Sequence, residues 1–410
     1  MNLDSQIIFD PAEDFTALLA KVPAKWVVYL MSDEQGAPVQ LLCVKNLRAS
    51  LQRRLGENEQ IGPTKRVGYR DLVRKISWCR VDSAFEADLV YLALARQIFP
   101  QTYRGMLAFK EAWFLHIDPT APFPRFTKTN DPASVLFDSQ RSMGVSPMFN
   151  APEHGQDAHT TRQTTPILIG PIKDKDSAGR LIEMIEDTFD LCRYYNVLLE
   201  SPHGRACAYK EMGRCAAPCD GTVPIEHYHE IIHRSIAALL HPADYCKTCE
   251  TQMRQSATDL NFEQAGKIKT HLERHARLHA GQFSHLRSLS DFHFLSLQRG
   301  PGEKKSKLFL ITPTRCEELL GLLGPDITWR RVLEYAHLRV SDLEPEFNLP
   351  AAEQIAIVAS HLFSTKKQGV IIPWSDLTEK SLAGAHKQLA KQKPEEDSPD
   401  EGVVKDLQVM

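Results

Sequence analysis

Four of the nine cysteines lie in one turn-rich stretch of the chain, at Cys192, Cys207, Cys215 and Cys219. Their spacing is C-x14-C-x7-C-x3-C, and glycines and a proline interrupt it between residues 204 and 221. Because glycine and proline break regular helix, we expect a tight knuckle on which short side chains converge. Four converging thiolates are the ligands of a structural zinc ion or of an iron–sulfur cluster.

Buried free thiols and disulfides are the alternative interpretations of these cysteines. Cys215 and Cys219 lie among Lys210, Arg214 and alanines, whereas buried free thiols favour apolar surroundings. Disulfides need an oxidising compartment, and the start MNLDSQIIFDPAEDF lacks the basic and apolar regions of an export signal. The residues therefore favour a metal ion or cluster. The later pair Cys246 and Cys249 has the C-x2-C spacing of half a zinc site, and it stays open as an alternative ligand pair.

The sequence around the knuckle carries a family resemblance. RACAYKEMGRCAAPCDG (residues 205–221) and the preceding LIGPIKDKDSAGRLIEMIEDTFDLC (residues 168–192) resemble the cysteine-rich segment of the bacterial excinuclease family of UvrC and Cho. The resemblance implies that Cys192, Cys207, Cys215 and Cys219 hold a [4Fe–4S] cluster. Zinc remains the alternative on the residues alone.

Composition bounds what the chain can be. Its 410 residues are 42% apolar and 25% charged, as in soluble globular proteins, and predict two to four domains. The net charge of −3 excludes bulk attraction to polyanions, so a nucleic-acid surface would be local. No apolar run approaches the ~20 residues of a membrane span. We expect a cytoplasmic protein with no membrane partner.

Residues 26–99 follow the pattern of a small α/β domain. WVVYLM (26–31) and VQLLCV (39–44) predict a strand hairpin, 76–81 a third strand, and 45–55 and 83–99 helices. Residues 41–80 contain ten Lys and Arg and three acidic residues, which give this segment a net charge of +7. This is either a track for DNA phosphates or an ordinary solvated face. The candidate DNA-binding side chains are Lys45, Arg48, Arg53 and Arg54.

This order of elements, with WVVYLMSDEQGAPVQLLCVKNLRASLQRRL (residues 26–55), is similar to the GIY-YIG nuclease domain of the same family. The similarity implies Mg²⁺-dependent incision of DNA and puts the family's first tyrosine on Tyr29. The second tyrosine falls on Gln40, the catalytic arginine on Ser50 and the metal-binding glutamate on Tyr91; Glu86 fills only a non-catalytic position. Tyr29 is therefore a remnant catalytic candidate.

Phosphodiester hydrolysis needs charge stabilisation and a metal held by a carboxylate. Ser50 carries no charge, and Tyr91 is no hard anionic ligand. Asp88, one helical turn before Tyr91, is the nearest acid that would replace it. We expect a degenerate nuclease domain in which Mg²⁺ is doubtful and Tyr29 has a packing role.

Residues 253–278, MRQSATDLNFEQAGKIKTHLERHARL, predict a helical hairpin whose second arm is capped by Asn261. The segment resembles the UVR motif that the excinuclease proteins UvrB and UvrC share. That resemblance implies binding to UvrB through a surface at Phe262, Glu263, Ala265 and Ile268. A hairpin buried in its own domain is the alternative.

His271, His275 and His279 recur every four residues on the second arm. They would span ~12 Å along a helix, too far for one metal ion. We expect a solvated, weakly basic stripe.

Patterns elsewhere predict further elements. Helices are expected from a cap at Asp176 or Ser177, over 223–240, over CEELLGLL (316–323), and from Pro350 onward. Strands are expected at 112–118, 166–170 and 329–335, and in the pair DFHFLSLQR and KLFLITPT.

The expected fold is a multidomain α+β chain. We assign residues 1–24 to a leader, 25–115 to the GIY-YIG-like domain, 116–169 to a linker with strands and 170–245 to the cysteine-rich module. The UVR-like hairpin takes 246–285, a C-terminal α/β region 286–390 and a disordered acidic tail 391–410.

Three functions follow as hypotheses. The first is a UvrC-like protein of nucleotide excision repair that binds DNA and excinuclease partners with weak or absent incision. The second is an active Cho-like, Mg²⁺-dependent endonuclease. The third is a cluster-bearing adaptor that does not bind DNA.

Overall fold

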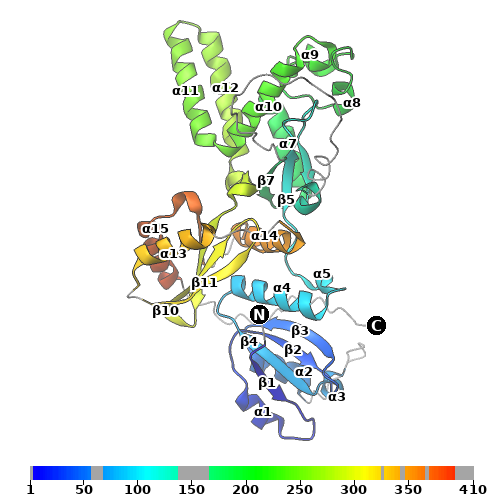
Figure 1. Cartoon of the computed structure of the whole chain (residues 1–410), viewed down its shortest axis with the longest axis vertical. Coiled ribbons are helices and arrows are strands. Elements are labelled where there is room, and N and C mark those ends of the chain that lie inside the picture. Colours follow the sequence, from blue (N-terminus) through cyan, green and yellow to red (C-terminus); the bar gives the residue numbers. More distant parts are fainter. Residues whose placement is uncertain are drawn as a thin grey trace, which may run out of the picture.

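A computed structural model of the chain describes residues 3–56, 68–136, 166–324, 327–341, 347–364 and 369–392. It is a mixed α+β protein with three four-stranded antiparallel sheets, which confirms the predicted class. The molecule is long and narrow (Figure 1). The N-terminal sheet lies at one end and a helical hairpin at the other, and the C-terminal sheet lies between them at the side of the long axis.

The N-terminal domain is a sheet of order β1-β4-β2-β3 with helices on both faces. Its elements are β1 (Ser5–Ile8), α1 (Phe15–Lys21), β2 (Val27–Ser32), β3 (Pro38–Val44), α2 (Leu47–Leu55), α3 (Tyr69–Leu72), β4 (Lys75–Arg80), α4 (Ala84–Ile98) and α5 (Tyr103–Met106). Successive residues of a strand point to opposite faces. Tyr29 therefore packs with α2, whereas Val28 packs with α4.

The segment predicted as a leader is part of this sheet. Strand β1 pairs antiparallel with β4, from Ser5 opposite Trp78 to Ile8 opposite Lys75. Phe9, Leu18 and Leu19 are buried in the core on the α2 side. The sequence pattern does not predict this first strand, because SQII is short and follows an acidic start.

The middle sheet, of order β6-β5-β7-β8, supports the cysteine-rich segment and the hairpin. Its elements are β5 (Trp113–Ile117), β6 (Thr127–Thr129), β7 (Ile167–Ile172), α7 (Lys175–Phe189), α8 (Tyr195–Leu198), α9 (Ala208–Glu211), η1 (Pro218–Asp220), α10 (Ile225–Leu240), α11 (Pro242–Thr258), α12 (Phe262–Leu278), η2 (Gly281–His285) and β8 (Arg287–Ser288). The predicted linker (116–169) thus contains β6 and parts of β5 and β7, and its residues 137–165 lie outside the described part.

The first helix of this region begins earlier than expected. Asp174 caps α7 by accepting a hydrogen bond from the backbone N–H of Ser177. The expected caps, Asp176 and Ser177, lie inside the helix. Ser177 is fully buried and faces Gln282.

The C-terminal domain is a sheet of order β11-β10-β9-β12 flanked by helices. Its elements are η3 (Leu289–Asp291), β9 (Phe294–Gly300), β10 (Gly302–Ile311), β11 (Cys316–Leu323), α13 (Trp329–Ser341), α14 (Leu349–Leu362), β12 (Val370–Pro373), η4 (Trp374–Asp376) and α15 (Glu379–Lys391). The predicted strand pair and the helix with an early Pro350 are confirmed. The tail from residue 393 lies outside the described residues.

Two predictions in this domain are wrong. Residues 316–323 form strand β11 and not a helix. The helix was expected because the buried residues Cys316, Leu319 and Leu323 are three and four positions apart. That spacing arises from the irregular register of β11 against β10. Residues 329–335 begin helix α13 instead of a strand. Val332 and Ala336, one helical turn apart, are its buried contacts.

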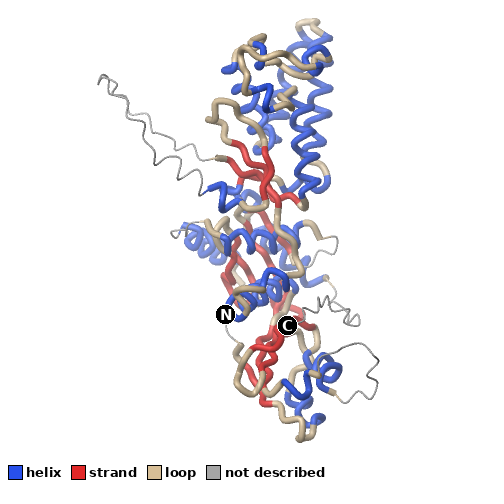
Figure 2. The backbone as a smooth tube through the Cα atoms, turned by 90° about the vertical axis from the view of Figure 1, so that its right-hand side faces the viewer, coloured by secondary structure: helices blue, strands red, loops and turns tan. Residues whose placement is uncertain are grey.

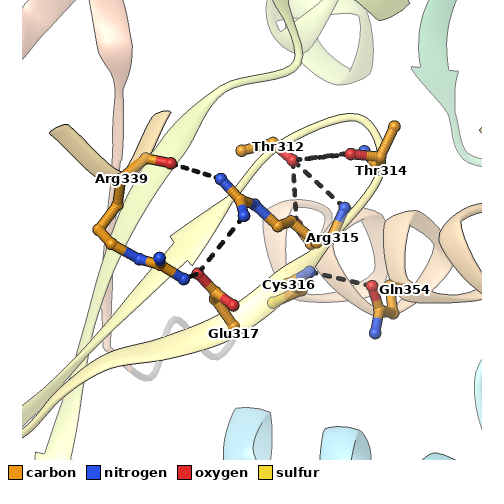
Figure 3. A network of polar contacts seen from close by, with 7 residues as sticks. All are labelled: Thr312, Thr314, Arg315, Cys316, Glu317, Arg339 and Gln354. Carbon is orange, nitrogen blue, oxygen red and sulfur yellow. Dashed lines mark hydrogen bonds and ion pairs between the residues drawn. The ribbon is translucent and has the colours of Figure 1, made fainter. Parts of the chain in front are cut away.

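Helix α14 lies between the C-terminal sheet and the N-terminal domain (Figure 1). Figure 3 shows how the sheet holds it: the side-chain oxygen of Gln354 accepts a hydrogen bond from the Cys316 backbone N–H at 2.9 Å. Beside it Arg339 of α13 pairs with Glu317 of β11 at 2.8 Å, and Arg315 donates to the Arg339 carbonyl.

Candidate functional site

The two residues aligned with the first tyrosine and the catalytic arginine of the GIY-YIG pattern form a hydrogen bond with each other. Tyr29, from the middle of β2, and Ser50, from α2, are both 0% exposed, and their hydroxyl oxygens lie 2.9 Å apart. Burial raises the pKa of Tyr29, only partly offset by the Ser50 hydrogen bond and by Arg54 and Arg53. The pair is a packed, neutral contact.

The other aligned positions lie elsewhere. Tyr91 of α4 packs on the opposite side of the sheet and donates a hydrogen bond to the Leu41 carbonyl at 3.4 Å; burial raises its pKa to about 12. Asp88, the possible replacement acid, lies 2.9 Å from His361 of α14. Glu86 is 2.5 Å from Lys307 of β10. The structure therefore brings Tyr29 to Ser50 but brings no acid of α4 to either residue.

The candidate DNA-binding side chains lie on α2 or just before it. Arg48 donates to the Val22 carbonyl, at the end of α1, at 3.1 Å. Arg54 donates to the Gln40 side chain at 3.1 Å, and the Lys45 ammonium lies 5.7 Å from the centre of the Trp26 ring. Arg48 and Arg53 are exposed. At least three of the four cations thus make contacts inside the domain.

The cysteine-rich segment is a knuckle, as its glycines and proline predict. Cys192 follows α7, whose last turn ends at Asp190 with φ of 53°, and Cys207 directly precedes α9. Cys219 lies in η1, between Ala217 and Gly221, which both have positive φ. These left-handed residues turn the chain sharply around Cys215 and Cys219.

Two of the four thiols are in contact. A hydrogen bond between Cys192 and Cys215 raises the pKa of Cys192, together with burial, and lowers the pKa of Cys215. The Ala217 backbone N–H also donates to the Cys215 sulfur at 3.4 Å. Burial raises the pKa of Cys219, and Cys215 lies near enough to add to that shift.

The donor set suits a thiolate-bound metal in kind, with four cysteines on one knuckle. In the part of the chain that the structure describes, however, no three His, Cys, Asp or Glu side chains are grouped as ligands of an ion. The thiols that meet directly are those of Cys192 and Cys215.

The later cysteines lie on α11 and face the neighbouring helix. The Cys246 sulfur is 3.4 Å from Nδ1 of His275, and Cys249 is buried beside Tyr245. Burial raises the pKa of Cys246, followed by the nearby Cys249. These are the properties of packed thiols at a helix contact.

The prediction of a solvated histidine stripe is wrong. Nε2 of His275, which is 1% exposed, and Nε2 of His279 both lie close to the Ala238 carbonyl, at 3.0 and 3.1 Å. Nδ1 of His271 lies 3.1 Å from the Thr188 carbonyl, and its Nε2 lies 2.8 Å from the Tyr245 hydroxyl. Both carbonyls belong to the last turns of helices α10 and α7, where backbone acceptors lack helical partners. The three histidine side chains therefore hold α12 against the ends of α7 and α10.

The hairpin projects from the rest of the molecule (Figures 1 and 2). Leu260 is 75% exposed and Phe262 is 67% exposed. Asn261 caps α12 as predicted, accepting from the Gln264 backbone N–H. Glu263 pairs with Lys267 at 2.7 Å on the surface, and Ala265 and Ile268 are half-buried. The alternative of a fully buried hairpin does not hold for this tip.

A groove of about 1020 Å³ runs beside the hairpin, between α10, α11 and α12 and the end of α7. Its charged lining is mixed, with Arg234, Lys267 and Arg274 against Asp190 and Asp244. No sequence signal predicted this groove, since it depends on how four helices pack.

Comparison with known proteins finds a family match in the middle of the chain. A family model described as "UvrC/Cho excinuclease, middle domain" matches residues 149–238. UvrABC system protein C of Syntrophotalea carbinolica is 24% identical over 259 residues, which are 63% of this chain and 37% of that protein. The protein of the same name from Caldanaerobacter subterraneus subsp. tengcongensis is 23% identical over 259 residues, 62% and 37% respectively. That of Campylobacter jejuni (strain RM1221) is 31% identical over 104 residues, 25% of this chain and 17% of that protein.

The chain spans about 37% of the length of the first two relatives. No solved structure matches it. Within the described ranges, no helix combines the length and apolar character that a membrane crossing needs. The match of residues 149–238 to the middle domain and the similarity to proteins named UvrABC system protein C support a UvrC/Cho-like protein.

Proposed function

We propose that this protein acts in nucleotide excision repair, binding DNA and excinuclease partners in the cytoplasm with weak or no incision of its own. Similarity to this family supports the repair role. The observation that carries the loss of incision is the buried hydrogen bond between Tyr29 and Ser50. A nuclease tyrosine has to reach a phosphodiester, and this one is 0% exposed.

The positions aligned with the residues that cleave the strand carry other side chains. Ser50 replaces a guanidinium that would stabilise the developing negative charge, and the aligned acid position is Tyr91. Asp88 is held by His361, so it is not placed to hold Mg²⁺ near Tyr29. A Mg²⁺ cofactor is accordingly doubtful, and an active Cho-like endonuclease is the less supported alternative.

The proposed partner surface is the tip of the UVR-like hairpin. Phe262 and Leu260 expose apolar side chains on a projecting element, which is uncommon for a surface with no partner. Glu263, Ala265 and Ile268 flank them on the same arm. The partner that the resemblance implies is the excinuclease protein UvrB.

The proposed cofactor is a [4Fe–4S] cluster, with zinc as the alternative, held by Cys192, Cys207, Cys215 and Cys219. Either group would tie the end of α7 to the knuckle and contribute folding free energy there. The contact between Cys192 and Cys215 supports a shared site for these two of the four cysteines.

An adaptor that does not bind DNA is the third candidate, and the internal hydrogen bonds of Arg48 and Arg54 favour it. Fluorescence anisotropy on a lesion-bearing duplex separates the candidates. We expect salt-dependent binding by the purified protein, and a larger complex once UvrB is added. Absence of DNA binding at low salt, with UvrB still bound, would favour the adaptor.

A further inference from the structure

Helix α4 of the N-terminal domain, the domain that resembles a nuclease, is buried on two sides. One side packs on β2 and β3 of its own sheet, and the other side packs on α14 and the C-terminal sheet. Its buried residues, Phe85, Glu86, Ala87, Leu89, Val90, Leu92, Leu94 and Ala95, surround the helix axis. A helix that is apolar all round belongs inside a core and not at a surface.

The apolar core runs without a break from the first domain into the last. Val28 and Leu41 of the N-terminal sheet share one cluster with Phe309 and Ile311 of β10. Phe85 forms the centre of the junction. Its ring meets Phe309 edge to face at 5.4 Å and His361 at 5.2 Å.

Buried charges cross the same junction in both directions. Lys307 of β10 places its ammonium 2.9 Å from Asp82 and 2.5 Å from Glu86, and its side chain is 13% exposed. Glu353 of α14 accepts from Arg96 at 2.5 Å and from the Tyr103 hydroxyl at 2.7 Å. A buried charge whose partner is removed is strongly destabilising, so these pairs fix the register of the two domains.

We propose that the C-terminal domain is an internal partner that permanently covers the α4 face, so that it and the nuclease-like domain fold and unfold as one unit. The α4 face is then closed to metal ions, DNA and other proteins. Contacts between this chain and other molecules have to use different surfaces, such as the α2 side and the projecting hairpin. This inference stands on the junction itself and does not depend on the repair role.

Hydrogen exchange of the whole protein in increasing urea tests the unit directly. Amides of α4 and α14 are expected to lose protection at the same urea concentration, because their side chains share a core. Two separate midpoints, one for each helix, would overturn the proposal.

Matched lysine variants give a second test under native conditions. Lys307→Met is expected to speed exchange of α4 amides at least tenfold, although residue 307 lies more than 200 positions away in the chain. Lys305→Met, on the same strand but exposed, should leave α4 unchanged. Glu353→Gln serves as a milder variant, which keeps a side chain able to accept from Tyr103, and should speed the same amides. Unchanged α4 exchange in both Lys307→Met and Glu353→Gln would contradict the proposal.

Discussion

The hydroxyl oxygens of Tyr29 and Ser50 lie 2.9 Å apart in a core that excludes solvent from both residues. One of the two hydroxyls donates the hydrogen bond and the other accepts it. Because the contact joins the internal strand β2 to α2, it contributes to the stability of the N-terminal domain.

Removing one partner of this pair should destabilise the protein. Tyr29→Phe leaves the Ser50 hydroxyl buried and unpaired, and is expected to lower the free energy of unfolding by about 1–3 kcal/mol. Urea denaturation followed by circular dichroism measures the change. The double variant Tyr29→Phe, Ser50→Ala should cost less than the sum of the single changes. Strict additivity would mean that the two hydroxyls do not interact.

The arginines of α2 should separate into structural and DNA-binding roles. Arg53→Ala is expected to weaken DNA binding and to reduce the slope of log K against log salt by about 1, as for one lost phosphate contact. Arg48→Ala should also lower the thermal midpoint, because it removes the hydrogen bond to Val22. Anisotropy titrations at several salt concentrations measure the first effect and calorimetry the second. An unchanged salt slope in both variants would remove α2 from the DNA surface.

The hairpin tip should be needed for a partner and not for the fold. Phe262→Ala is expected to weaken binding to UvrB at least tenfold while leaving the thermal midpoint unchanged, because the side chain is 67% exposed. Met212→Ala is the matched control, since Met212 is 63% exposed but lies in the cysteine-rich module. Equal affinity of the two variants in calorimetric titration would exclude the tip as the binding surface.

The knuckle cysteines should determine metal content. Replacement of Cys215 by Ser is expected to remove most of the bound iron, or zinc, from anaerobically purified protein. Cys43→Ser, at an exposed thiol outside the knuckle, should keep it. Elemental analysis gives the metal and its stoichiometry, and visible absorption distinguishes a cluster from zinc. If the native protein is fully folded without metal, the knuckle cysteines do not bind a metal or cluster and only pack as thiols.

The histidine contacts should make stability depend on pH. Burial lowers the pKa of both His271 and His279, so below about pH 6.5 the unfolded chain takes up protons before the folded one. Stability from these groups is therefore present above that pH and falls as pH decreases. Burial raises the pKa of Glu186 to about 7, an effect of opposite sign, so each variant is compared with the native protein.

His279→Gln keeps a donor for the Ala238 carbonyl but cannot take up a proton. Its loss of stability between pH 6.5 and about 5 is expected to be smaller than that of the native protein. The exposed His203→Gln should follow the native curve. Parallel curves for all three proteins would show that His279 does not contribute.

Much of the fold follows from local patterns in the sequence. Short β-branched and aromatic runs at 26–31 and 39–44 predict β2 and β3, and the Asn261 cap predicts where α12 begins. These features depend on neighbours in the chain. Strand β11 does not follow from its own residues, because its bulged pairing with β10 produces a helical spacing of Cys316, Leu319 and Leu323, which only the partner strand explains.

The candidate sites are harder to predict, because burial is decided by distant segments. The spacing of His271, His275 and His279 is visible in the sequence, but their acceptors lie in α7 and α10, up to 83 residues away. The burial of α4 on both sides can be predicted from its sequence, AFEADLVYLALARQI, because apolar residues lie all around the helix axis. Its partners in α14 and β10 could not be read from that segment.

Incision of a defined lesion-bearing duplex with Mg²⁺ and UvrB tests most directly whether the nuclease-like domain has lost its chemistry. An active member of the family, assayed on the same substrate, supplies the positive control. We expect no nicked product above background from this protein, and no change on Tyr29→Phe. Site-specific nicks that disappear on Tyr29→Phe or Asp88→Asn, with the variant still folded, would contradict the loss of catalysis.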